Sequence, residues 1–284
     1  MEELKKQLNN LLLEVMDLDR RLQISLPKSI LQEAIQGRLV EQRNEDGSAE
    51  ELLQRIKEEQ ARQIKDGKLK KSAISNSVIF RGDDNKYYEK IDGTITCIDE
   101  LLPFSIPENW AWCRLKDLIF IQTGASFQKE HVNKDSNGVR ILRGGNISPS
   151  RYMLKEDDIF VSIEYLNNVR YLKEGDIITP AVTSLDNIGK MAVIDKDLNN
   201  ITAGGFVFII SPYFKHYIHS LFIAYFMQSP FMIEAMKKIT KKSGSAFYNL
   251  GKERLKELFF PLPPISEQIR VINKISNIFS IIES

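Results

Sequence analysis

The chain has 284 residues, of which 43% are hydrophobic and 27% are charged, and its formal net charge is +1. This composition excludes disorder as the main state, and the length suffices for one large domain or two modest ones. The longest apolar run spans about residues 221–227, far short of the roughly 20 residues that cross a bilayer, and the N-terminus lacks a signal-peptide pattern. Two cysteines, Cys97 and Cys113, are too few for a disulfide framework. We therefore expect a cytoplasmic protein without a membrane partner.

An apolar seam occupies the first 22 residues. Its members alternate between four and three residues apart: Leu4, Leu8, Leu11, Val15, Leu18 and Leu22. This spacing over about three heptads predicts a helix that requires a partner helix, although one short stripe alone would also suit an ordinary core helix. Pro27 lacks an N–H group and disfavours helical geometry before it, so it should interrupt or restart the helix.

The seam spacing returns at the other end of the chain. Pro264 is well placed to open a helix, because its missing N–H falls where no intrahelical partner exists. The apolar positions of this helix are Ile272, Ile275, Phe279 and Ile282. We expect the two terminal helices to form an antiparallel coiled coil, with surplus N-terminal seam left to bind a second copy of the chain.

Residues 1–75 read as a helical spacer and dimerisation region. Ser48 with Glu51 three residues later is the signature of a helix cap, which predicts a helix over residues 50–64. The basic tail at residues 67–71 suits either solvated lysines at a helix C-terminus or a phosphate contact. Residues 76–106 are expected to be an extended linker, with a β-hairpin around Asp92-Gly93.

The segment from residue 107 to residue 263 reads as one mixed α/β domain, and residues 264–284 as the C-terminal coiled-coil helix. Helices are expected from residue 217 to 228 and from the Ser229-Pro230 break to about residue 239. The predicted strands are bounded by Gly, Asn, Asp and Pro turns and cover residues 140–142, 158–161, 176–181, 190–194 and 206–211. The fold class is therefore α+β, with a mixed domain flanked by long terminal helices.

Two basic segments of this domain are candidates for nucleic-acid contact. Residues 237–256 carry seven bases and one acid, interleaved with Ser, Asn, Tyr and Gly. Cations on such loops suit a phosphate backbone, and Arg and Asn side chains pair well with guanine and adenine edges. Each residue alone could equally be a solvated surface side chain. The candidate DNA-binding residues are Lys129, Arg140, Arg143, Asn146 and Arg151 in the first segment and Lys241, Lys242, Ser243, Ser245, Tyr248 and Asn249 in the second.

Motifs for catalysis and metal binding are absent from the sequence. His216 and His219 lie three residues apart, but a zinc site needs four ligands and the cysteines are distant. The phosphate-binding loop, the nucleophile elbow, the zinc-protease motif and the dinucleotide fingerprint do not occur, nor does the tetrapeptide of adenine methyltransferases. We therefore predict no catalytic residues, no metal and no cofactor in this chain.

Several segments, in order along the chain, resemble the specificity subunits of type I restriction–modification systems. Residues 106–118 resemble the entry to a target-recognition domain, and residues 29–40 and 51–56 resemble the helical spacer. The proline-rich element at residues 260–268, which ends in Glu267-Gln268, is the most specific of them. The remaining segments are residues 174–178, 188–192 and 244–250.

The resemblance implies a non-catalytic subunit that reads double-stranded DNA through a target-recognition domain at residues 107–263. Its partners would be methyltransferase and restriction subunits, which would hold S-adenosylmethionine, ATP and Mg. Family members usually carry two recognition domains and this chain has one, so it is either a natural half-subunit or a piece of a longer protein. A homodimer of halves would read a bipartite target with two identical, inverted half-sites. A stand-alone DNA-binding protein outside restriction and an unrecognised DNA-modifying enzyme stay open as alternatives.

Overall fold

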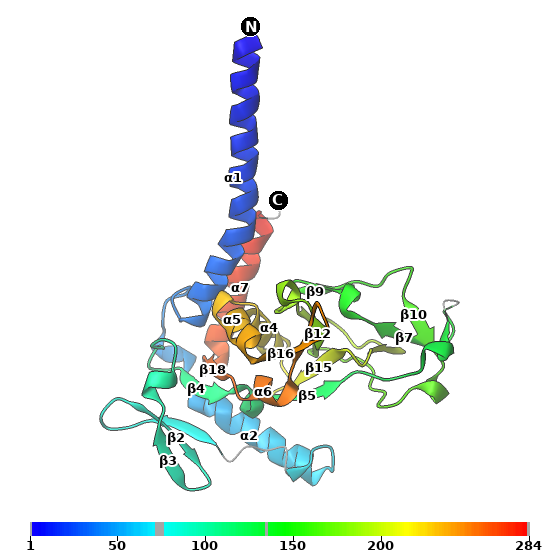
Figure 1. The fold of residues 1–284 in the computed structure, drawn as a ribbon. Coiled ribbons are helices and arrows are strands. Elements are labelled where there is room, and N and C mark those ends of the chain that lie inside the picture. Colours follow the sequence, from blue (N-terminus) through cyan, green and yellow to red (C-terminus); the bar gives the residue numbers. More distant parts are fainter. Residues whose placement is uncertain (1, 72–76, 134–135, 283–284) are drawn as a thin grey trace.

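The computed structural model describes residues 2–71, 77–133 and 136–282, without the side chains of residues 2–10, 19 and 24 (Figure 1). Helices and strands both occur throughout the middle of the chain, which confirms the α+β class. The helices are α1 (Glu2–Ile35), α2 (Ala49–Lys65), α3 (Leu115–Leu118), α4 (Tyr217–Met227), α5 (Pro230–Ile239), α6 (Lys252–Lys256) and α7 (Ile265–Ile282).

Short strands form several small sheets instead of one large sheet. The central four-stranded sheet has the order β13-β11-β15-β5 and is antiparallel throughout, and a second has the order β14-β7-β10-β6. The strands of these two sheets are β5 (Ile119–Thr123), β6 (Val132–Asn133), β7 (Val139–Leu142), β10 (Ile159–Val161), β11 (Ile177–Pro180), β13 (Ala192–Val193), β14 (Ile201–Ala203) and β15 (Val207–Pro212). Each of the five strands predicted from the sequence is present, with its ends shifted by at most two residues.

The smaller sheets extend this framework. They are β12-β17-β16, β18-β4, β8-β9 and β1-β2-β3. Their strands are β1 (Val78–Arg81), β2 (Tyr87–Ile91), β3 (Thr94–Cys97), β4 (Ala111–Arg114), β8 (Ile147–Ser148), β9 (Arg151–Tyr152), β12 (Val182–Thr183), β16 (Thr240–Ser243), β17 (Phe247–Leu250) and β18 (Phe259–Leu262).

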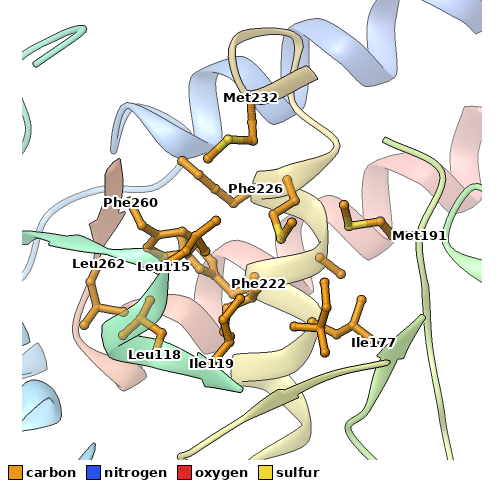
Figure 2. Packing of buried hydrophobic residues seen from close by; sticks show 14 of the residues in the cluster. Leu115, Leu118, Ile119, Ile177, Met191, Phe222, Phe226, Met232, Phe260 and Leu262 are labelled. Carbon is orange, nitrogen blue, oxygen red and sulfur yellow. The ribbon is translucent and has the colours of Figure 1, made fainter. Parts of the chain in front are cut away.

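The hydrophobic core is formed where α4 meets strands from distant parts of the chain (Figure 2). Phe222 and Phe226 of α4 lie against Phe260 of β18, with ring centroids 6.0 and 4.2 Å apart. Leu115 and Leu118 close the same cluster and are fully buried. Aromatic pairs at these separations stabilise a core beyond their buried area alone. The apolar face of α4 therefore lies in the core, with Leu221 and Tyr225 partly buried at its edge.

Polar caps fix the ends of the helices at the predicted places. The Ser48 side chain accepts a hydrogen bond from the Glu51 N–H at the start of α2. Ser229 caps α5 in the same way through the Met232 N–H, and Pro230 occupies the first turn. Such caps satisfy N–H groups that have no partner within the helix, which is why the chain changes direction at these serines.

The helix α1 runs through Pro27 without a break, so the predicted interruption is wrong. Proline removes one backbone hydrogen bond, but burial of Ile30, Leu31, Ala34 and Ile35 against the domain stabilises the following turns. Helix α7 packs antiparallel beside this C-terminal part of α1, and the N-terminal half of α1 projects beyond it (Figure 1).

The seam residues of α7 are divided between two environments. Ile272 and Ile275 are buried in the main core, and Phe279 contacts Tyr225 of α4 at 6.0 Å between ring centroids. Ile282 is partly buried at the C-terminal end. Helix α7 therefore binds α4 as well as α1, and the coiled coil stays a prediction.

Residues 77–106, expected to be an extended linker, contain the three-stranded sheet β1-β2-β3. The Asp92-Gly93 turn joins β2 to β3 with positive φ at both residues, as the hairpin prediction requires. Buried Glu89 of this sheet accepts two hydrogen bonds from the Arg114 guanidinium at 2.8 and 2.6 Å, which holds the Glu89 pKa below its usual value. This bidentate pair attaches the sheet to β4.

A buried polar junction at the start of α7 ties distant segments together. Glu267 accepts hydrogen bonds from Trp110 Nε1 at 2.8 Å and from Gln42 Nε2 at 2.7 Å. Gln268 donates to the Pro263 carbonyl and accepts from His219 at 2.9 Å. Burial raises the Glu267 pKa and lowers the His219 pKa to about 4, since both charged forms are poorly solvated there.

The His219 pKa predicts a loss of stability in acid. The unfolded-state pKa is near 6.5 and the folded-state value is about 4, so the neutral histidine stabilises the fold above pH 6.5 and this contribution falls as the pH decreases toward 4. Between pH 7 and pH 5 the free energy of unfolding should decrease by about 2 kcal/mol from this residue. Urea unfolding of wild type and His219→Gln at both pH values measures the contribution. The control variant His216→Gln, which replaces an exposed histidine, should lose as much stability between pH 7 and pH 5 as the wild type. If His219→Gln also loses as much as the wild type, His219 is not the source of the acid sensitivity.

Candidate nucleic-acid interface

One β-hairpin carries six of the eleven predicted DNA-binding residues. Strands β16 and β17 pair in antiparallel register, with Lys241 opposite Asn249, Lys242 opposite Tyr248, and Ser243 opposite Phe247. The turn between the strands contains Ser245 and has Gly244 at φ +81°, a conformation that glycine adopts without strain. The basic segment predicted to be a loop is therefore a regular hairpin.

The register divides the hairpin into two faces, because side chains alternate along a strand. Leu250 is buried and Tyr248 is partly buried, so the face that they share with Lys242 is directed toward the body of the domain. The opposite face carries Lys241, Ser243, Phe247 and Asn249, all exposed. We call these four residues the outer hairpin face; it combines a cation, a hydroxyl, an amide and an aromatic ring.

The sequence prediction missed Phe247, whose side chain is 55% exposed. Neither Lys241 nor Lys242 forms an ion pair within the part of the chain that the structure describes. Both ammonium groups are exposed, and exposed lysines of this kind suit a phosphate backbone.

The hairpin is anchored to the central sheet through Ala181, between β11 and β12. The Leu250 N–H donates to the Ala181 carbonyl at 2.9 Å, and β12 continues the pairing with Val182 opposite Asn249. Figure 1 shows β16 and β12 on the side of the molecule between the helices and the β7-β10 sheet. Backbone bonds thus hold the hairpin, and its outer side chains are not needed for the attachment.

The turn at residues 143–146 lies beside the same corner of the sheet. Gly144 approaches Pro180, since a Cβ atom at Gly144 would lie 3.7 Å from the proline ring. The Arg143 side chain is 48% exposed and donates a 3.3 Å hydrogen bond to the Asp157 carbonyl. Arg143 is therefore at the surface, with its guanidinium held by an exposed loop.

Asn146 occupies a structural position, in contrast to its predicted contact with a base. It is buried, its Oδ1 accepts from the Arg143 N–H, and its Nδ2 donates to the Met153 carbonyl and to Asp158 at 2.9 and 2.5 Å. The amide satisfies the backbone of its own turn, as Asn side chains commonly do. Its hydrogen-bonding groups are thus used within the protein and are not available to a base edge in this structure.

The other three candidates lie apart from the hairpin. Arg140 is on β7, where its guanidinium lies 5.0 Å from the Phe160 ring centroid and 3.8 Å from Asp158, so it supports the β7-β10 sheet. Lys129 is exposed near β6 in the same sheet. Arg151, on β9, lines a groove with Gln23 and Pro27 of α1 and residues of α7. None of these three residues lies on the hairpin itself.

A second exposed surface lies on the projecting half of α1. Leu11, Val15, Leu18 and Leu22 are between 49% and 63% exposed. The predicted seam continues to Leu4 and Leu8, whose side chains lie outside the described residues. Exposed leucines in this number on one helix are unusual on a monomer and mark an interaction surface.

Among the side chains that the structure describes, no group of three or more His, Cys, Asp or Glu residues could hold a metal ion. Over the same part of the chain, none of the helices has the length and apolarity of a membrane span. Burial raises the pKa of the Cys113 thiol and lowers the His219 pKa to about 4, and both residues are buried; burial also raises the pKa of the partly buried Asp117 to about 6.

Comparison with known proteins gives a family match and several relatives. Residues 107–284 match the type I restriction modification DNA specificity domain. The type I restriction enzyme EcoAI specificity subunit of Escherichia coli is 31% identical over 266 residues, covering 89% of this chain and 39% of the relative. The EcoEI specificity subunit of the same organism is 23% identical, covering 90% and 40%.

The chain spans about two fifths of the length of these curated relatives. The crystal structure of the HsdS subunit from Thermoanaerobacter tengcongensis has 18% identity and a TM-score of 0.45, with 83% of this chain and 49% of that chain covered. The family match begins at the boundary predicted for the mixed domain and includes the hairpin, the turn at residues 143–146 and α7. The resemblance expected from the sequence is confirmed: the chain belongs to the family of type I restriction modification DNA specificity domains.

Proposed function

We propose that this chain reads a sequence in double-stranded DNA and directs methyltransferase and restriction subunits to it. The observation that carries the proposal is the match of residues 107–284 to a DNA specificity domain. The relatives are named as specificity subunits of type I restriction enzymes. The proposal therefore assigns recognition to this chain and catalysis to its partners.

The geometry supports a DNA-facing role for the hairpin. The outer hairpin face offers Lys241 for phosphate, and Ser243 and Asn249 for hydrogen bonds to phosphate or bases. A two-stranded ribbon fits the width of the major groove, so this hairpin has a suitable shape for reading base edges. Arg143 would contact the same duplex from the neighbouring turn.

The proposal places the cofactors outside this chain. S-adenosylmethionine would belong to the methyltransferase subunit, and ATP with Mg to the restriction subunit. The absence of catalytic motifs from the sequence agrees with this division, and a cytoplasmic location follows from it, because the DNA and the partner subunits would be there.

We further propose that two copies associate through the projecting half of α1. The exposed Leu11, Val15, Leu18 and Leu22 would pair with the same residues of a second chain, removing apolar surface from water. A two-fold dimer would present two identical domains, and its target would be two inverted half-sites separated by an unread spacer. Pairing with a missing second half of a longer protein is the alternative that the length of the relatives supports.

Selection from a pool of random duplex DNA tests the main proposal. Wild-type protein should enrich one bipartite sequence, and the two enriched halves should be inverted copies if the chain acts as a dimer. Enrichment of a single half-site would favour a chain that needs a different second half. A pool that stays random after repeated rounds would contradict sequence recognition by this chain.

Replacement of both hairpin lysines tests the phosphate contact. Lys241→Ala with Lys242→Ala should weaken binding to every duplex and reduce the slope of log affinity against log salt by about 2, because two counterion-releasing contacts are lost. Titrations by fluorescence anisotropy at several salt concentrations give the slope. The control pair is Lys86→Ala with Lys90→Ala, which removes two exposed lysines from the β1-β2-β3 sheet. A slope unchanged in the hairpin variant would remove these lysines from the interface.

Light scattering across a concentration series tests the dimer. The chain has a mass of 32.7 kDa, and we expect wild type to approach twice this value, whereas Leu11→Asp with Val15→Asp should stay monomeric because buried charges disfavour the seam. The control replaces the exposed Leu101 and Leu154 with Asp, which should leave the dimer intact. Dimers that persist in the seam variant would locate the interface elsewhere.

A further inference from the structure

Phe206 is the most exposed of the large apolar side chains in the described part of the chain, at 75%. It ends the turn Gly204-Gly205-Phe206 between β14 and β15. Gly204 and Val207 are buried, and only Gly205 and Phe206 between them are exposed, so the ring extends from a short exposed turn between buried residues. Single exposed apolar residues are common, and the case for Phe206 depends on what holds it and what surrounds it.

The turn that presents Phe206 is fixed by backbone hydrogen bonds. The Phe206 carbonyl accepts from the Ala181 N–H at 2.8 Å, and the Val207 N–H donates to Gly204 at 2.9 Å. The Gly204 N–H donates to Leu142 at 2.9 Å. These hydrogen bonds make the turn rigid before any partner binds. The turn would therefore lose little conformational freedom when the ring binds a partner.

The turn that carries Phe206 is bonded to both elements assigned to DNA. Gly204 bonds to Leu142, the residue before Arg143. The Ala181 N–H donates to the Phe206 carbonyl, and the Ala181 carbonyl accepts from the Leu250 N–H. The turn and the hairpin are therefore both bonded to the backbone of Ala181. Backbone hydrogen bonds thus link the turn that carries Phe206 to the segment that precedes Arg143 and, through Ala181, to the hairpin that carries Lys241.

An exposed aromatic ring on a turn bonded to two cation-bearing elements fits a nucleic acid better than an apolar protein surface. The cations would bind phosphates on either side of the ring, and the ring would contact bases between them. Apolar side chains that enter a duplex act as wedges which partly unstack a base step. Burial of the ring against bases would also remove it from water.

We infer that Phe206 is such a wedge, inserted at one base step of the target; the inference rests on the proposed function and names a recognition residue for it. The probe is the duplex that wild type enriches from the random pool, with 2-aminopurine placed at each adenine in turn. Wild type should raise the fluorescence at one step, since unstacking relieves the quenching of 2-aminopurine. Phe206→Ala should lose this signal and bind about tenfold more weakly, and Phe206→Trp should restore both.

The matched control is Phe80→Ala, which removes an exposed phenylalanine from β1 in the separate three-stranded sheet. It should keep both the wild-type affinity and the fluorescence change. If Phe206→Ala keeps the affinity, the sequence preference and the fluorescence change of the wild type, the inference is overturned. The proposed function would remain intact in that case. A wild-type chain that enriches no sequence would contradict the proposed function, and the inference with it.

Discussion

The hydrogen bonds to the buried carboxylate of Glu267 join parts of the chain that are otherwise far apart. Its two oxygens accept from Gln42, after α1, and from Trp110, at the start of the mixed domain. Gln268, the next residue, binds His219 of α4 and the Pro263 carbonyl. Loss of these donors would destabilise the fold, because little water reaches the buried carboxylate to replace their hydrogen bonds. The junction therefore requires α1, α4, α7 and the mixed domain to keep one arrangement.

This arrangement connects the two exposed surfaces of the molecule. Helix α7 is held by the junction at its first turn and packs on both α1 and α4. The hairpin is held by the central sheet, which packs on α4 through Ile177 and its neighbours (Figure 2). In a dimer formed through α1, the separation between two hairpins would thus be set by helix length and packing. A rigid spacing of this kind is what recognition of two half-sites at a fixed distance requires.

Local signals in the sequence were sufficient for the regular elements. Serine caps, Pro230 and Pro264 mark helix starts, and β-branched runs between turns mark the five predicted strands. Pro27 was misjudged because packing of the following turns outweighs one lost hydrogen bond. The hairpin at residues 240–250 was missed because its strands are short and include Lys241, Lys242 and Asn249, residue types with low strand propensity. One of its strands also pairs with β12, more than sixty residues earlier in the chain, which no local pattern reveals.

Local sequence patterns predicted the candidate site less completely than the regular elements. Charge indicated the hairpin residues, but it could not show that Arg140 would pair with Asp158 and Phe160, and composition could not show that Asn146 would be buried by its own turn. Phe206 carried no charge signal and became visible only through its exposure. Three segments distant in sequence meet at Pro180-Ala181: the turn at residues 143–146, the turn that carries Phe206, and the hairpin. Backbone hydrogen bonds hold the Phe206 turn and the hairpin there. Since Phe206 and the outer hairpin face contribute no side chain to this attachment, they can be replaced with little cost to the fold. A recognition surface built in this way can change its target by side-chain substitution on an unchanged framework.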